Sequence, residues 1–327
     1  MNLYGILWRA LAPALAALAL IAFGPAAAQD YPTKIIRLVV PYTPGGGADR
    51  MARLLSQYLP PILGQNVVVD NKGGASGAIG TELVARSAPD GYTWVMGTDP
   101  PFTINPHLRQ QPFDAVRDFA PVVLVAKVPL VLVARPGLPA NDIPELVKLA
   151  REQPGKITAA SSGTGSSAHL AAELLATTAG VKFFHVPYKG QNEAISDVMS
   201  GRVDLNFSAI ESVAGLIKAG KLKAIAIGSD RRFAGLPGVK TIAESGYPGF
   251  DVAAWHGLLV PAGTPPAIIA KINDAVNKVL QIPDVQSRLE QGALQAVGGP
   301  PDALAQLITS DSARWAKVIR DAGIKPE

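Results

Sequence analysis

The stretch RLVVPYTPGGGADRMARLLSQYL, from Arg37 to Leu59, decides the fold. The apolar run from Ile35 to Val40 predicts a strand, a Gly-rich turn follows it, and apolar residues then recur at helical spacing. Those helical residues are Met51, Leu54, Leu55 and Tyr58. The stretch KITAASSGTGSSAHLAAELL, from Lys156 to Leu175, repeats this order of strand, turn and helix. Strands that alternate with amphipathic helices are typical of an α/β fold with mostly parallel sheets.

Both Gly-rich turns open a helix, and a helix start leaves backbone N–H groups unpaired and carries about half a positive charge. Such a start attracts an anion such as a carboxylate. In PGGGAD, from Pro44 to Asp49, three glycines allow a ligand to approach the backbone, and Asp49 can cap the helix or orient a neighbouring amide. The second turn adds the hydroxyl donors Ser161, Ser162, Thr164, Ser166 and Ser167. Each turn is either a ligand loop or a plain strand-to-helix turn, with Ser167 as a simple N-cap in the second case.

The rest of the chain continues the alternation of strands and helices. Further strands are expected at residues 66–70, 92–96, 156–160, 203–207, 223–228 and 255–260. Helices are expected at 81–86, at 141–152 and in the carboxy-terminal tail. Either Asn141 or Asp142 caps the helix at 141–152.

The run from Pro121 to Ala134 contains Lys127 and Pro129, so it is expected to form two short strands with a break between them. We take that break as one hinge candidate and the neighbourhood of Gly228 as the other. A chain of 327 residues usually forms more than one core, which predicts two domains. The expected domains are residues 29–126 together with 229–327, and residues 127–228. Two crossings between them would make a hinge with a cleft.

The amino-terminal residues 1–28 read as a signal peptide that is removed near Ala28. Arg9 precedes an apolar run from Leu11 to Phe23, which is shorter than the roughly 20 residues that span a bilayer, although an uncleaved anchor is the alternative. We therefore expect a periplasmic location, which the absence of cysteine suits. The net charge of +4 has no concentrated basic block, so nucleic acid is not expected as a partner.

Catalytic and metal sites find little support in the sequence. The four histidines, His107, His169, His185 and His256, lack the spacing of a metal motif, and no metal or cofactor is expected. His169 shares a helix with Ser166 and is poorly placed to act as its base, and no G-x-S-x-G is present. A partly buried histidine bonded to backbone is the simpler reading of His169.

Four other residues have an open role. Tyr42 either faces a cleft or closes the core, whereas Phe102 and Trp255 are expected in the core. Asp204 either accepts from a ligand or, as we favour, caps a neighbouring loop.

Taken together, the motifs YTPGGGADRMARLL, GQNVVVDNKGGASGAIG, APDGYTWVMGT, SSGTGSSAHLAAELL, HVPYKG, GRVDLNF and WHGLLVPAGTP resemble the Bug family of periplasmic solute receptors, which serve tripartite tricarboxylate transporters. The resemblance covers nearly the whole chain after the signal peptide. It implies a two-domain α/β periplasmic binding protein of the Venus-flytrap, type II-like class, with mixed sheets flanked by helices. The segment Asp99-Pro100-Pro101-Phe102 departs from the family pattern and is expected to reshape one pocket wall.

The resemblance also implies where the ligand binds. Backbone amides and bridging waters of the two turns are expected to hold a small organic carboxylate. In the first domain the implied residues are Tyr42, Pro44, Gly45, Gly46, Gly47, Ala48, Asp49 and Thr98. In the second domain they are Ser161, Gly163, Thr164, Gly165, Ser166, Ser167, His169, Asp204 and Ser208.

The sequence therefore predicts a non-enzymatic receptor, acting as a monomer, that passes an aliphatic or aromatic carboxylate to membrane transporter subunits. Two alternatives stay open at this point. One is a periplasmic hydrolase on a similar scaffold, and the other is a ligand sensor for a signalling partner.

Overall fold

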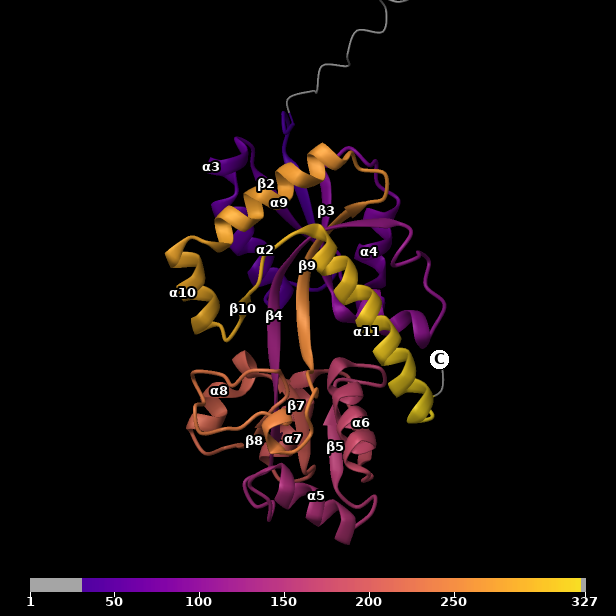
Figure 1. Ribbon diagram of the computed structural model, residues 1–327, viewed down its shortest axis with the longest axis vertical. Helices are drawn as coiled ribbons and strands as arrows, with labels where there is room; N and C mark the ends of the chain where they lie inside the picture. Colours follow the sequence, from indigo (N-terminus) through magenta and orange to yellow (C-terminus); the bar gives the residue numbers. More distant parts are fainter. Residues whose placement is uncertain (1–30, 325–327) are drawn as a thin grey trace, which may run out of the picture. The chain divides into compact units, whose positions relative to one another are not determined.

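A computed structural model describes residues 31–324 of the protein (Figure 1). One compact unit begins at Lys34 and contains all the helices and strands that follow. The predicted signal peptide, residues 1–28, lies outside the described residues. Within residues 31–324, no helix is both long enough and apolar enough to cross a membrane.

A ten-stranded mixed sheet forms the centre of this unit, in the order β2-β1-β3-β9-β4-β7-β5-β6, with β8 and β10 also paired to β4. The strands are β1 (Ile36–Val40), β2 (Val67–Asn71), β3 (Thr93–Thr98), β4 (Phe119–Ala134), β5 (Thr158–Ser161), β6 (Phe184–Pro187), β7 (Leu205–Ala209), β8 (Lys223–Ile227), β9 (Ala253–Pro261) and β10 (Gln295–Ala296). The α/β class with mixed sheets is confirmed.

The sheet has two halves that share β4. Sheet A contains β1, β2, β3, β9, β10 and the first part of β4, and sheet B contains β5 to β8 and the last part of β4. Parallel pairing joins β1 to β2 and β3, and β5 to β6 and β7, because each connection is a helix crossover. Every pairing of β4 is antiparallel.

The predicted break at Lys127 and Pro129 is wrong, because β4 is one strand of 16 residues. Lys127 pairs with Trp255 of β9, and Pro129 is the last residue of β4 in register with β9. From the next residue onward, β4 pairs with β7 and β8 instead. A proline has no N–H to donate, and it is tolerated here because it stands where the strand changes partners.

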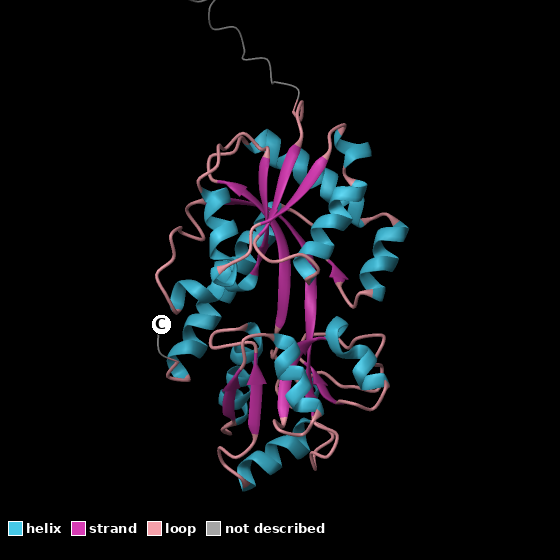
Figure 2. Cartoon of the chain, turned by 180° about the vertical axis from the view of Figure 1, so that it is seen from behind, coloured by secondary structure: helices cyan, strands magenta, loops and turns pink. Residues whose placement is uncertain are grey.

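Helices flank the sheet on both sides (Figure 2). They are α2 (Gly47–Tyr58), α3 (Pro60–Leu63), α4 (Ala78–Ala85), α5 (Ile143–Glu152), α6 (Ser167–Ala179), α7 (Gln191–Met199), α8 (Ile210–Lys218), α9 (Pro266–Leu280), α10 (Pro283–Gln291) and α11 (Pro301–Asp321). Short turns of helix are η1 (Ala75–Gly77), η2 (Pro100–Ile104), η3 (Asn105–His107) and η4 (Ala243–Ser245).

The cap of α5 is the second of the two predicted candidates. Asp142 accepts a hydrogen bond from the Glu145 N–H at 2.9 Å, and the Glu145 carboxylate accepts one from the Asn141 N–H at 2.7 Å. The two contacts satisfy exposed donors at the helix start reciprocally.

The apolar cores follow the two halves of the sheet. Beside sheet A, Phe102 and Trp255 are each 1% exposed and pack with Val39 and Phe119, which confirms that both aromatic residues belong to the core. The rings of Phe102 and Phe119 meet edge to face with centroids 5.0 Å apart. A second core packs α5 and α6 on sheet B.

The segment 229–252 stays with sheet B after β8 ends. Ile242 donates from its N–H to Ile227 O, and Leu236, Phe250 and Val252 are buried in the cores on sheet B. The chain then enters β9 at Ala253. Both crossings therefore lie close together, because the Gly228 N–H donates to Leu130 O and Gly228 O accepts from the Val252 N–H. The domain boundaries themselves stay a prediction.

Candidate functional site

The first Gly-rich turn joins β1 to α2 and is organised by a buried acid. Asp49 is 3% exposed and accepts from the Gly45 N–H at 2.9 Å, from Asn71 Nδ2 at 3.0 Å and from Arg53 Nε at 2.9 Å. The hydrogen bond from Arg53 is the main cause that lowers the pKa of Asp49 to about 2. Asp49 therefore orients the amide of Gly45, one of its two predicted roles, while Gly46 is the N-cap without a side-chain bond.

Gly47 of this turn lies against Glu211 of α8, a helix beside sheet B, and against His256 of β9. A Cβ added to Gly47 would lie 3.2 Å from His256 Nε2 and 3.3 Å from Glu211 Oε1, so a larger residue would crowd these groups. Arg50, in the first turn of α2, pairs with Glu211 of α8 at 2.5 Å. The turn thus connects sheet A to an element beside sheet B.

The second Gly-rich turn joins β5 to α6 and presents hydroxyl groups. Ser166 is the N-cap, because its hydroxyl accepts from the His169 N–H at 3.3 Å. Ser167, which was expected as an alternative N-cap, instead donates from its hydroxyl to Asp99 Oδ2 at 2.6 Å. Gly165 has φ +74° and donates its N–H to His169 Nδ1 at 3.1 Å. The start of α6 is therefore held by side chains and faces the segment after β3.

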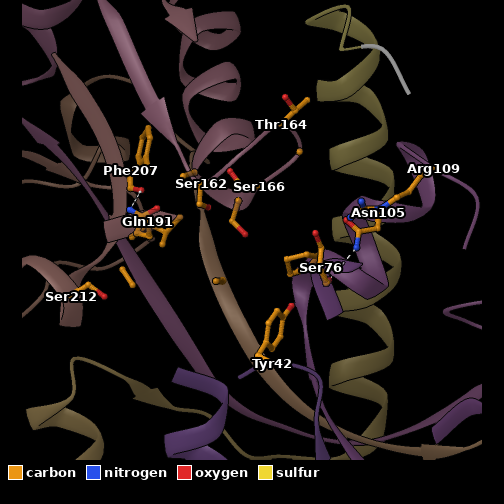
Figure 3. Close-up of a pocket in the computed structure, with 17 residues that line it drawn as sticks. Tyr42, Ser76, Asn105, Arg109, Ser162, Thr164, Ser166, Gln191, Phe207 and Ser212 are labelled. Carbon is orange, nitrogen blue, oxygen red and sulfur yellow. Dashed lines mark hydrogen bonds between the residues drawn. The ribbon is translucent and has the colours of Figure 1, made fainter. Parts of the chain in front are cut away.

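A cavity of about 350 Å³ lies between these elements (Figure 3). One wall comes from elements beside sheet A and contains Tyr42, Ser76, Pro100, Asn105 and Arg109. The other wall comes from elements beside sheet B and contains Ser162, Thr164, Gly165, Ser166, Ser167, Ala168, Gln191, Phe207, Ala209 and Ser212. Leu130 of β4 and Ala254 of β9 line it where the two halves of the sheet meet.

Tyr42 lines this cavity, so the open question of cleft or core is answered in favour of the cleft. Its hydroxyl shares a hydrogen bond with Thr98 Oγ1 at 2.8 Å, and burial raises the pKa of the phenol above its ordinary value. Thr98 is 6% exposed and does not line the cavity, so its hydrogen bond holds the Tyr42 hydroxyl on the side away from the cavity lining.

The predicted site residues divide into two groups. Those that line the cavity are Tyr42, Thr164, Gly165, Ser166 and Ser167. The others lie outside the lining: Pro44, Gly45, Gly46, Gly47, Ala48, Asp49, Thr98, Ser161, Gly163, His169, Asp204 and Ser208. Their part in ligand binding stays a prediction.

Three of the residues outside the lining make hydrogen bonds to other parts of the protein. Asp204 accepts from Arg135 Nε at 2.7 Å and from the Thr158 N–H at 2.9 Å, so it joins the ends of strands β4, β5 and β7. Ser161 is fully buried, and its hydroxyl shares a hydrogen bond with His185 Nε2 at 2.7 Å. Ser208 is 1% exposed and accepts from Gln191 Nε2 at 2.9 Å.

His169 is bonded to backbone, as expected from the sequence, because Nδ1 accepts from the Gly165 N–H. Its ring stacks on His185 with centroids 3.6 Å apart and an interplanar angle of 9°. Burial, and then the neighbouring His185, lower the pKa of His169 to about 3. The Ser166 hydroxyl contacts the backbone N–H of His169, and Nδ1 of the His169 ring is already bonded to Gly165. The His169 ring is therefore not placed to take a proton from Ser166. Among the described residues, no cluster of three or more His, Asp or Glu could hold a metal.

Several lining residues escaped the sequence analysis. Asn105 and Arg109 follow an irregular π-helix and carry no periodic signal. Ser76 lies in the loop NKGGASGAIG, whose glycines and the positive φ of 52° at Ser76 mark an unusual backbone. Gln191 begins α7 directly after the motif HVPYKG, which was quoted without assigning that helix.

Asp99, directly after β3, connects the elements beside sheet A to α6 beside sheet B through its hydrogen bond with Ser167. It is 4% exposed, and burial raises its pKa to about 7 despite the hydrogen bond from Ser167. Asp99 belongs to the segment Asp99–Phe102, which was expected from the sequence to reshape one pocket wall, and Pro100 beside it lines the cavity. A carboxyl group whose charge changes near neutral pH therefore lies behind this part of the wall, and it does not line the cavity itself.

We expect the free energy of unfolding to fall by about 1 kcal/mol between pH 6.5 and about pH 5. Burial lowers the pKa of His169 to about 3 and of His256 to about 4, from 6.5, so the folded chain excludes protons that the unfolded chain accepts. Their stabilisation is complete above pH 6.5 and is lost as the pH falls. Asp99 acts in the opposite direction, because its raised pKa favours folding as the pH falls from about 7 towards 3.8. Urea unfolding at several pH values measures the sum.

Asp99→Asn is the control for the opposing contribution. The variant lacks the stabilisation that protonation of Asp99 supplies, so its stability should fall more steeply on acidification than that of the unmodified protein. Equal slopes for the two proteins would contradict the role assigned to Asp99, and a stability that rises towards pH 5 would contradict the role of the histidines.

The chain is similar to a family of transporter receptors and to solved structures that contain a bound dicarboxylate. Residues 51–324 match the model of the tripartite tricarboxylate transporter family receptor. Protein BugT of Bordetella pertussis is 38% identical over 304 residues, covering 92% of this chain and 93% of BugT. The structure of Rpa4515 of R. palustris with adipate is 35% identical, with a TM-score of 0.80 over 91% of this chain and 100% of that chain. MatC of Rhodopseudomonas palustris with bound malate is 32% identical, with a TM-score of 0.75 over 88% of this chain and 100% of that chain.

Proposed function

Since the chain belongs to the family of tripartite tricarboxylate transporter receptors, we propose that it captures a small organic carboxylate in the cavity and delivers it to a membrane transporter. The family consists of periplasmic solute-binding receptors and not of enzymes. The substrate, the transporter and the removal of residues 1–28 on export are parts of this proposal, as is action as a monomer. Adipate and malate, bound by two relatives, are both dicarboxylates, but malate is two carbons shorter and carries a hydroxyl group that adipate lacks.

The observation that carries the proposal is the chemistry of the cavity wall. The first residues of α6, Ser167 and Ala168, line the cavity together with Ser162 and the N-cap Ser166, so the start of a helix borders this space. Arg109 is the charged residue of the lining, and the described residues that form the wall include no Asp or Glu. A helix start, hydroxyl donors and a cation together favour an anion, since hydrogen bonds to a carboxylate contribute about 1.5–3 kcal/mol each.

We also propose that the ligand is enclosed by movement of two domains. The predicted division, residues 29–126 with 229–327 and residues 127–228, agrees with the two walls of the cavity. The packing of segment 229–252 on sheet B favours counting it with the second domain, so that both crossings lie near the junction of β4 and β9. The contacts Arg50 to Glu211 and Ser167 to Asp99 join the two sides and support a closed arrangement.

Titration calorimetry of the chain without residues 1–28 tests carboxylate capture. Aliphatic and aromatic mono-, di- and tricarboxylates should include ligands of micromolar affinity, whereas the corresponding neutral amides should not bind. Failure of every acid to bind would refute the receptor proposal. Loss of uptake of the bound acid in cells without this protein tests delivery to a transporter separately.

Replacing Ser162 with alanine should weaken carboxylate binding about tenfold, because a hydroxyl donor in the cavity wall is removed. Titration with the tightest acid measures the change. Ser196→Ala is the matched control, since this hydroxyl donates to Asn192 O on the exposed face of α7. An equal loss in both variants, or no loss in Ser162→Ala, would contradict a ligand contact by Ser162.

A further inference from the structure

Gln191 lines the cavity with one end of its amide tied to buried groups. It is the first residue of α7, after the N-cap Gly190, and it belongs to the wall beside sheet B. Its Nε2 atom lies 2.7 Å from Asn206 Oδ1, 2.9 Å from Ser208 Oγ and 3.3 Å from Phe207 O. Figure 3 shows Gln191 beside Phe207 and Ser162 at this end of the cavity.

The orientation of the Asn206 amide fixes the orientation of the Gln191 amide. Asn206 is 1% exposed, and its Nδ2 donates to the carbonyl of Ala160 at 2.8 Å. A backbone carbonyl can only accept, so Asn206 Oδ1 must be the atom that faces Gln191. Asn206 Oδ1 is itself an acceptor and also accepts from the Ser208 hydroxyl. Gln191 must therefore present its NH₂ group to this cluster.

Rotation of the Gln191 amide by half a turn is unfavourable. It would place Oε1 against Asn206 Oδ1 and Phe207 O, two acceptors without a proton between them. The free-energy cost of leaving a buried polar group without a partner is larger than the net stabilisation from one hydrogen bond. The observed orientation of the amide is therefore strongly preferred. Neither Asn206 nor Ser208 lines the cavity, whereas Gln191 does. Because Nε2 is held by the buried cluster, Oε1 is the polar atom that Gln191 has left for the cavity.

An amide oxygen held in this way is an acceptor that cannot change to a donor. A second carboxylate oxygen of a ligand would be repelled there, whereas a hydroxyl group would be bound. An ammonium group would also donate, but it calls for an acidic partner, and among the described residues that line the cavity none is Asp or Glu. The neighbouring Ser162 and Ser166 hydroxyls remain able to donate to a carboxylate.

We infer that Gln191 is a specificity-determining residue that selects carboxylates carrying a hydroxyl group, because its side-chain oxygen is locked towards the cavity as an acceptor by Asn206 and Ser208. This inference rests on the proposed capture of a carboxylate. It goes beyond that proposal by naming the substituent that separates hydroxy acids from plain diacids of the same length.

Calorimetric titration with matched pairs of acids tests the inference. Malate is compared with succinate, and 2-hydroxyglutarate with glutarate, so that each pair differs in one hydroxyl group. In at least one pair the hydroxy acid should bind about tenfold more tightly or better, since a site built around a buried polar group penalises a ligand that leaves it unpaired. In Gln191→Met the two acids of that pair should bind with affinities within about threefold of each other.

Asn192→Ala, at the next and exposed position of α7, is the control that should keep the preference. If Gln191 has only a structural role, Gln191→Met should lower the affinity for both acids of a pair equally. The ratio of the two affinities would then stay unchanged, which would overturn the inference. The ratio in the unmodified protein tests it even if Gln191→Met does not fold, because equal binding of hydroxy and plain acids overturns it at once. Aspartate binding more tightly than malate would overturn the choice of a hydroxyl group.

The outcomes for this inference and for the proposed function are distinguishable. If acids bind but hydroxy acids are not preferred, only this inference is refuted. If no acid binds, the proposed function is refuted as well.

Discussion

Replacing Gly80 with alanine should lower the free energy of unfolding by about 2–3 kcal/mol, although alanine is the better helix former. Gly80 lies in α4, where the helix crosses the end of β1. A Cβ at this position would stand 2.6 Å from Lys72 O and 2.8 Å from Pro41 Cα. Both atoms belong to the backbone, so neither can rotate away, and the helix and the strand must separate. Urea unfolding measures the loss.

Gly215→Ala is the matched control for this substitution. Gly215 is also inside a helix, α8, but a Cβ there would meet no atom within 4 Å. The same change should therefore stabilise the protein by about 0.5–1 kcal/mol, the ordinary gain in helix propensity. A Gly80→Ala protein as stable as the unmodified one would show that α4 does not approach the backbone so closely. Since Pro41 precedes Tyr42, a shift of α4 would also reach the cavity wall.

Replacing Asp204 with alanine should lower the free energy of unfolding by about 2–3 kcal/mol. Its carboxylate accepts from Arg135 Nε at 2.7 Å, from the Thr158 N–H at 2.9 Å and from Thr158 Oγ1 at 2.8 Å. These contacts join the ends of β4, β5 and β7. Burial alone would raise the pKa of Asp204, but the bonds from Thr158 and Arg135 outweigh it and lower the pKa. Without the carboxylate, a half-buried guanidinium and a backbone donor lose their partner.

The control is Glu82→Ala, which removes an ion pair of a different kind. Glu82 contacts Arg86 one turn away on α4, and the Arg86 side chain is 71% exposed. Such pairs contribute a few tenths of a kcal/mol. Unfolding of both variants in urea should separate them by about 2 kcal/mol. If Asp204→Ala loses no more stability than Glu82→Ala, the contacts of Asp204 do not tie the three strands together.

Local patterns were sufficient to predict the strand, turn and helix units. The apolar stripe of Met51, Leu55 and their neighbours faces sheet A in α2, and the hydroxyl-rich turn opens α6, because both features depend on residues close together in sequence. Longer-range pairing could not be predicted. The strand β4 continues through Pro129 because β9 and β7 take over from one another there, and this depends on strands far along the chain.

The candidate site was predictable only in part for the same reason. Ser166 and Ser167 share a motif with a helix start, which made their side of the cavity visible in the sequence. Arg109 and Gln191 enter the wall through the packing of distant segments. The orientation of Gln191 depends on Asn206 and Ser208, which are 15 and 17 residues away and belong to another strand. A motif search has no means of detecting such a chain of donors and acceptors.

The carboxy-terminal helix α11 bridges the two cores of the protein (Figure 1). Its first half contributes Leu304 and Ile308 to the core beside sheet A, and its last turns contribute Trp315 and Ile319 to the core that holds α6. A rotation of one half against the other must therefore slide α11 across one of those cores as well as bend β4 and β9. The range of any such motion is therefore limited by three elements that cross between the halves, namely β4, β9 and α11.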